Sequence, residues 1–215
     1  GAKRAYGVDE GLSGAVPLSD LPRDEQGLCL IAAPRRLEQS ETIVHELPAL
    51  LDSAMAHFDA IVANTGANWG EQHAVLLERS SRALFLVDQR ASSLRACKHA
   101  VELCARCGIA ASPFLFVANR CSKRSLFSSI DVSCAMQGAH AAELKDGGVE
   151  VEQALGTGLT YDLVSSRNAF AQSVRELMGE VVGEAAGSLA SSEESEAPSR
   201  GLFSFRRARR EGVLP

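Results

Sequence analysis

Several features that mark common classes of protein are missing from this sequence. No apolar run approaches the roughly 18 residues needed to cross a bilayer, and no basic-then-apolar secretory leader opens the chain. A formal net charge of −5 argues against general nucleic-acid binding. With 215 residues and 46% hydrophobic composition, the chain can still bury one substantial core. These features predict a cytoplasmic protein with a single folded domain.

Motifs of familiar active sites are also absent. The chain holds no Gly-x-x-x-x-Gly-Lys-Ser/Thr loop, no Gly-x-Ser-x-Gly elbow and no His-x-x-x-His pair. Cys104 and Cys107 have metal-like spacing, but zinc normally takes four ligands and no second close pair follows. Cys97 and Cys104 share one helical stripe with Leu94. We therefore expect reduced cysteines in the core and no metal site.

What the sequence does contain is a series of short apolar segments separated by helical patterns. Segments that are apolar on both alternating faces are typical of buried parallel strands. The four predicted strands span 28–32, 60–63, 83–87 and 114–118, and the intervening helices span 40–57, 71–80 and 92–107. Gly108 follows the last of these helices as a left-handed stop. The alternation predicts an α/β fold with a mostly parallel, doubly wound sheet in three layers, whose ligands would bind at its carboxyl edge.

The remainder of the chain divides into a folded part and a polar end. A strand over 139–144, a helix over 149–155 and a final helix over 167–186 complete a predicted domain of residues 1–186. Composition then shifts to Ser, Glu, Ala and Pro, which predicts a flexible acidic linker over 187–200. A basic and apolar tail follows over 201–215.

Three of these segments, in this order, resemble signatures of the MinD/ParA superfamily of deviant Walker ATPases. They are Phe58-Asp-Ala-Ile-Val-Ala-Asn-Thr-Gly66, Arg82-Ala-Leu-Phe-Leu-Val-Asp88 and Phe114-Leu-Phe-Val-Ala-Asn-Arg120. The resemblance covers most of the chain and is strongest to the pilus-assembly branch called CpaE or TadZ. It implies a P-loop NTPase-like fold, ATP and Mg²⁺ as ligands, a homodimer, and partners in pilus or secretion machinery. The net charge of −5 leads us to expect no specific nucleic acid among the partners.

Two departures from that family concern the phosphate site. Its members carry a glycine-rich loop with two lysines after the first strand, where backbone N–H groups and lysine charge hold the phosphates. Gly1 aligns just beyond the family's second strand, so the first strand, loop and helix would either precede this sequence or have been lost. Asn64 replaces the Asp that helps to organise Mg²⁺, and an amide cannot supply the negative charge. ATP and Mg²⁺ are thus expected only with the missing segment, and hydrolysis should be weak or absent.

Asn119 and Arg120 follow the strand 114–118, at the predicted carboxyl edge. An Asn amide suits the adenine edge and an Arg plane can stack on a base. The resemblance assigns the base contact to Asn119. In the alternative interpretation, Asn119 caps a turn and Arg120 is solvated. Asp88, at the end of the preceding strand, is read as a turn or N-cap residue, and we predict no catalytic residue.

The C-terminal tail combines apolar and basic residues. Such a composition is typical of a reversible interfacial membrane anchor, which gains roughly 1 kcal/mol per basic residue near an anionic surface. The predicted membrane contacts are Leu202, Phe203, Phe205, Arg206, Arg207, Arg209 and Arg210. The family resemblance implies the same location, at the inner membrane. The alternatives are a basic tail that binds an acidic protein partner, or one that binds nothing.

Together these observations predict a localisation or assembly factor of MinD/ParA type, serving pilus or secretion machinery or cell-pole positioning. The alternative is a non-catalytic interaction scaffold derived from a P-loop ATPase. An unrelated metabolic enzyme would need an acid/base or nucleophile set, and the sequence shows none.

Overall fold

The structure is a computed structural model that describes residues 6–7, 17–24, 27–34, 40–66 and 69–195. Its main sheet has three strands in the order β3-β4-β5, all parallel. These strands span Ala83–Val87, Phe114–Cys121 and Ala141–Lys145. A smaller parallel sheet pairs β1 (Tyr6–Gly7) with β2 (Ile31–Ala32). Every strand pairing in the described part is therefore parallel, as the sequence predicts.

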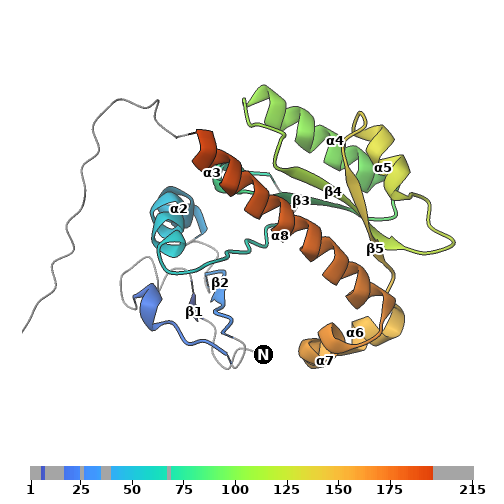
Figure 1. Cartoon of the computed structure of the whole chain (residues 1–215), viewed down its shortest axis with the longest axis horizontal. Coiled ribbons are helices and arrows are strands. Elements are labelled where there is room, and N and C mark those ends of the chain that lie inside the picture. The colour runs from blue at the N-terminus through green and yellow to red at the C-terminus, as the bar shows by residue number, and fades with distance from the viewer. Residues whose placement is uncertain (1–5, 8–16, 25–26, 35–39, 67–68, 196–215) are drawn as a thin grey trace, which may run out of the picture.

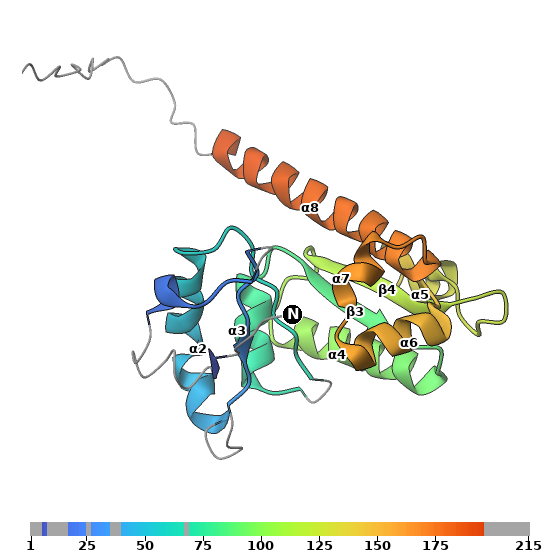
Figure 2. The same ribbon diagram turned by 90° about the horizontal axis from the view of Figure 1, so that it is seen from below.

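Helices cover both faces of the main sheet, which gives three layers (Figures 1 and 2). On one face, α4 and α5 pack on Val87, Phe116 and Ala118. On the other, α8 places Leu177 against Leu115, Val117 and Leu144. The long helices are α2 (Ser40–Met55), α4 (Ala91–Arg106) and α8 (Ala169–Ser195), and the shorter ones are η1 (Leu18–Asp20), α3 (Glu71–Arg79), α5 (Ser129–Ala135), α6 (Gly148–Thr157) and α7 (Thr160–Ser165). The predicted α/β sandwich is confirmed.

One predicted strand is wrong and another is shorter than expected. Residues 60–63 form no strand, and Ile61 and Val62 are exposed, Val62 by 93%. Of the strand predicted over 28–32, only Ile31–Ala32 pairs. An apolar run becomes a strand only where a neighbour supplies hydrogen bonds, and no described strand lies in register with 60–63.

One edge of β3 also has no paired strand among the described residues. Among the described strands, β3 pairs only with β4. The helix α8 covers β4 and β5, and it leaves Leu84 and Leu86 of β3 38% and 57% exposed. The sheet thus stops at an apolar strand whose second edge has no described partner.

The final helix is longer than predicted. It continues to Ser195 rather than ending at Ala186, so the first nine residues assigned to the flexible linker are helical. Elongating an existing helix costs little compared with nucleating one, and Leu, Ala and Glu within this stretch favour helix. The rest of the predicted linker lies outside the described residues. In the described part of the chain, no helix is long and apolar enough to span a membrane.

The cysteines take the places expected of core residues. Cys97 and Cys104 are buried on α4, and Gly108 has the predicted left-handed conformation, with φ of 76°. Cys107 and Cys134 are exposed. Burial raises the pKa of the Cys97 thiol to about 11, so this thiol stays protonated at neutral pH.

The buried and the exposed cysteines should differ in their rate of reaction with a thiol reagent. At pH 8 we expect Cys107 and Cys134 to react quickly, because both are exposed, and Cys97 and Cys104 to react only as fast as the protein opens. Mass spectrometry of peptides after timed alkylation measures each rate. Equal rates for Cys97 and Cys134 in the folded protein would contradict the burial of α4.

Candidate functional site

The candidate site lies at the carboxyl edge of the main sheet, where three strand ends meet. β3 is followed by Asp88, Gln89 and Arg90. Asn119 and Arg120 lie close to the end of β4. Parallel strands bring their carboxyl ends to one edge, and open α/β sheets bind ligands there. The fold therefore brings the predicted residues Asn119 and Arg120 next to the loop that begins at Asp88.

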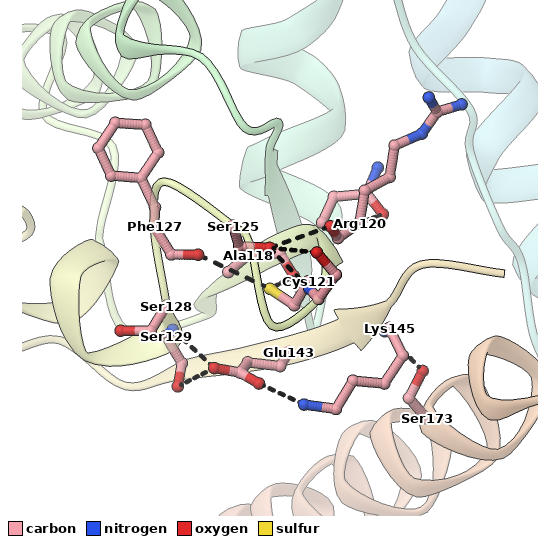
Figure 3. Close-up of polar contacts among 12 residues, drawn as sticks. Ala118, Arg120, Cys121, Ser125, Phe127, Ser128, Ser129, Glu143, Lys145 and Ser173 are labelled. Atoms are coloured by element: carbon pink, nitrogen blue, oxygen red, sulfur yellow. Dashed lines mark hydrogen bonds and ion pairs between the residues drawn. The ribbon is translucent and has the colours of Figure 1, made fainter. Parts of the chain in front are cut away.

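Asn119 and Arg120 form a bulge near the end of β4. The register with β5 shifts between Ala118 and Cys121, and Arg120 has a φ of 54°. Outside glycine this left-handed conformation costs roughly 1–2 kcal/mol. The Arg120 N–H donates to Asn119 Oδ1 at 3.0 Å, which supports the turn locally. Figure 3 shows the exposed Arg120 side chain extending away from the pair formed by Glu143 and Lys145.

Gln89 holds this bulge in place. Its Nε2 donates to the carbonyl oxygen of Asn119 at 2.8 Å and to that of Phe127 at 3.1 Å. Its Oε1 accepts from the Phe127 N–H at 2.9 Å. One half-buried amide thus joins the end of β3 to the bulge and to the loop before α5. Such an arrangement keeps a strained turn in a single conformation.

Asn64 takes no part in these hydrogen bonds and lies in an exposed segment between α2 and α3. His73, near the start of α3, makes two hydrogen bonds to backbone groups before that helix, and its Nδ1 accepts from the Gly70 N–H at 3.2 Å. Its Nε2 is therefore the donor to the Gly66 carbonyl oxygen, at 3.1 Å. His73 also stacks on Trp69, with ring centroids 5.1 Å apart. The predicted residue Asn64 is thus not among the residues that Gln89 joins by hydrogen bonds at the sheet edge.

A second polar cluster lies where β5 meets α5 and α8 (Figure 3). Glu143 accepts from the backbone N–H and the hydroxyl of Ser129 at 3.0 and 3.1 Å, and from Lys145 Nζ at 2.6 Å. The hydrogen bond from Lys145 is the main reason that the pKa of Glu143 is lowered, and the same bond raises the pKa of Lys145. Both groups are therefore charged at neutral pH.

Two adjoining hollows flank this cluster. One, of about 540 Å³, runs beside β5 and α8 and is lined by Glu143, Lys145, Ser173 and Glu176 among others. The other, of about 590 Å³, lies between the loop 121–128 and the end of β5, and also includes Glu143 and Lys145. Neither is lined by Asn119 or Arg120.

The described residues suit a nucleotide base better than they suit a triphosphate with Mg²⁺. The Nδ2 group of Asn119 has no acceptor among the described residues, so it could pair with a base edge. Asp88, however, places a carboxylate at the same edge, 3.4 Å from Arg90. Among the described residues, no group of three His, Cys, Asp or Glu side chains could hold a metal. Asn64 offers no charge to Mg²⁺, so these residues do not fit metal-bound triphosphate.

Sequence reasoning missed Gln89 as an organising residue, and it missed the cluster around Glu143. One usable signal was Ser128-Ser-Ile-Asp131, which reads as a capping box and does begin α5. Ser128 Oγ accepts from the Asp131 N–H at 3.3 Å. All predicted membrane contacts in the tail lie outside the described residues.

Three solved structures are similar to this chain. The structure of a ParA family ATPase from Chlorobium tepidum TLS matches with a TM-score of 0.70 and 16% identity, over 86% of this chain and 78% of that chain. The MinC:MinD cell division protein complex of Aquifex aeolicus matches at 0.53 and 21%, over 81% and 73%. MinD of Aquifex aeolicus matches at 0.52 and 19%, over 81% and 75%. No protein-family model and no curated protein matches the sequence. The chain therefore has the P-loop NTPase fold of ParA and MinD.

Proposed function

We propose that this protein is a MinD/ParA-like localisation or assembly factor for pilus or secretion machinery or for cell-pole positioning. It acts in the cytoplasm and at the inner membrane surface, and its hydrolysis of ATP is weak or absent. The observation that carries the proposal is the Asn119 and Arg120 bulge, clamped by Gln89 at the carboxyl edge of a ParA-type sheet. The structure of MinD with MinC supports protein partners for this fold, and we propose a homodimer as the working form.

Within the site, Asn119 contacts the base and Arg120 stacks on it or steers an anionic ligand. The chain lacks a Gly-Lys loop, Asn64 supplies no charge for Mg²⁺, and Asp88 repels phosphate oxygens. The open edge of β3 is where a phosphate-loop strand of the MinD/ParA type would pair. Weak hydrolysis is therefore proposed for these 215 residues.

Nucleotide titration tests this proposal. We expect ATP with Mg²⁺ to bind the 215-residue chain no more tightly than adenosine, because the phosphates meet no cradle. Calorimetry with both ligands measures the ratio of the dissociation constants. Binding of ATP about tenfold or more tighter than adenosine, and lost in Asn119→Ala, would point to an active ATPase site instead.

Vesicle flotation tests the localisation. We expect the protein to float with vesicles rich in phosphatidylglycerol, and the fourfold variant Arg206→Glu, Arg207→Glu, Arg209→Glu and Arg210→Glu to lose most of that binding, since each arginine contributes roughly 1 kcal/mol at the surface. A matched control reverses four exposed charges on the folded domain, namely Arg95, Lys98, Lys123 and Arg124. Equal flotation by the tail variant and the wild type would remove the membrane from the proposal.

The second candidate function is a non-catalytic interaction scaffold on the same fold. It is favoured by Asn64, which supplies no negative charge for Mg²⁺, and by the Asp88 carboxylate at the same sheet edge as Asn119. The adenosine comparison separates the two candidates, because a pure scaffold binds neither ligand. A scaffold would also keep its partner binding unchanged in Asn119→Ala.

A further inference from the structure

The strand β5 ends the main sheet, and its outer edge has unpaired backbone groups. Among the described strands, β5 pairs only with β4. The N–H of Phe116 donates to the carbonyl oxygen of His140, so even-numbered residues of β5 turn their backbone groups toward β4. Ala141, Glu143 and Lys145 therefore point theirs outward. The N–H groups of Ala141 and Glu143 have no acceptor among the described residues, and their carbonyl oxygens have no donor there.

The edge is closed at one end and has space beside the rest. The Lys145 N–H donates to Ser173 Oγ of α8 at 3.0 Å, so it is not available to another strand. The Glu143 side chain is already held by Lys145 Nζ at 2.6 Å and by Ser129. A hollow of about 540 Å³ runs along β5 beside α8. What the edge offers a partner is therefore the backbone of Ala141 and Glu143.

This short edge is complementary to itself in one antiparallel register. When Ala141 lies opposite Glu143 of a second copy, the two residues exchange both of their N–H···O bonds. The two-fold axis repeats the pair, so all the unpaired backbone groups of Ala141 and Glu143 are satisfied in both copies. Ala142 then faces its counterpart at the axis, where a small methyl group suits a Cα separation of about 4.5 Å.

The side chains favour this register over its neighbour. With the axis at Glu143 instead, two carboxylates lie opposite each other, and pairing needs the Lys145 N–H that Ser173 already holds. With the axis at Ala142, each Glu143 lies opposite an alanine, so no like charges meet. Ala141 and Ala142 also place no charge or proline at the edge, and those are the means by which natural sheets block such pairing.

We propose that two copies of this chain join through β5, with Ala141 of each copy opposite Glu143 of the other. The sheets then become continuous in the order β3-β4-β5-β5-β4-β3. Because the strands of the two copies run in opposite directions, the two Asn119 bulges lie at opposite edges of the joined sheet. The inference rests on the homodimer of the proposed function and names its interface, which forms with or without a nucleotide.

Disulfide trapping on the full chain tests this interface. In a background with Cys107→Ser and Cys134→Ser, which removes the exposed thiols, Ala142→Cys places one thiol of each copy beside the two-fold axis. We expect oxidation with diamide to give a covalent dimer whose linking peptide joins position 142 to itself. The exposed control Glu152→Cys, on α6, should give at least about tenfold less covalent dimer, because its backbone positions lie too far apart to bridge.

Sedimentation equilibrium on Ala141→Pro gives a second measurement. Proline removes the outward N–H and puts a ring carbon in its place, at an edge position where the fold itself uses no hydrogen bond. We expect the dissociation constant of the dimer to rise at least about tenfold while circular dichroism stays unchanged. Addition of ATP should not alter the dissociation constant of the wild type.

The outcomes separate the interface from the homodimer. A wild type that stays monomeric at every concentration overturns both. A dimer that persists unchanged in folded Ala141→Pro and gives no link at position 142 overturns the interface alone, as does a dimer that forms only with ATP. Nucleotide titration and vesicle flotation succeed or fail independently of these results, so the rest of the proposed function is tested separately.

Discussion

Leu177→Ala should lower the free energy of unfolding by about 2–5 kcal/mol. Leu177 is only 5% exposed and packs α8 against Leu115, Val117 and Leu144. Removing its side chain leaves a cavity at the centre of the layer between helix and sheet, so the lost burial is not recovered. Urea unfolding followed by circular dichroism measures the change.

The neighbouring residue provides the control. Met178 is on the same helix but is 38% exposed, so Met178→Ala should cost well under half as much. Similar losses for both variants would mean that α8 does not pack on the sheet through the Leu177 side.

Gln89→Glu should destabilise the protein by about 1–3 kcal/mol at neutral pH. The substitution replaces an N–H donor with a carboxylate oxygen that faces the carbonyl oxygens of Asn119 and Phe127. Two acceptors then lose their donor and a negative charge is placed beside them. Thermal and urea unfolding at pH 7 measure the loss, and the exposed change Arg90→Ala serves as a control in the same loop.

The pH dependence of this variant gives a sharper signature. Once protonated, the introduced carboxyl group can donate again, so folding raises its pKa above the usual glutamate value of about 4.3. The penalty relative to the wild type should therefore be small at low pH and should grow as the pH rises through the raised pKa. A penalty that is independent of pH would show that Gln89 does not donate to the two carbonyl groups.

The local sequence pattern was sufficient to predict the helices and strands whose intrinsic propensity agrees with their packing. The segment 83–87 has the length and apolar composition of a strand, and it forms β3 with the predicted bounds, paired with β4. The helix predicted over 92–107 appears at Ala91–Arg106, since its apolar stripe and Gly108 fix both the face and the end. Such elements can be predicted from sequence because propensity and packing agree.

Elements that depend on distant partners could not be predicted in this way. The run 60–63 has the composition of a strand, yet hydrogen-bonded pairing is decided by what lies beside it. Gln89 acts on residues 30 and 38 positions away, and nothing in its local sequence marks that role. Asn119 and Arg120 were predicted to follow a strand that ends at residue 118, whereas β4 continues to Cys121 and includes both of them. The left-handed turn of Arg120 accompanies a register shift that is visible only in three dimensions.

The uncovered side of β3 has a consequence for handling the protein. Leu84 and Leu86 expose apolar side chains next to backbone N–H and C=O groups that hydrogen-bond to no described strand. An exposed apolar strand edge is a template on which a second copy of the chain can pair. Concentrated preparations should therefore grow into larger particles by stacking strand on strand, and a lysine at position 86 should keep them dispersed.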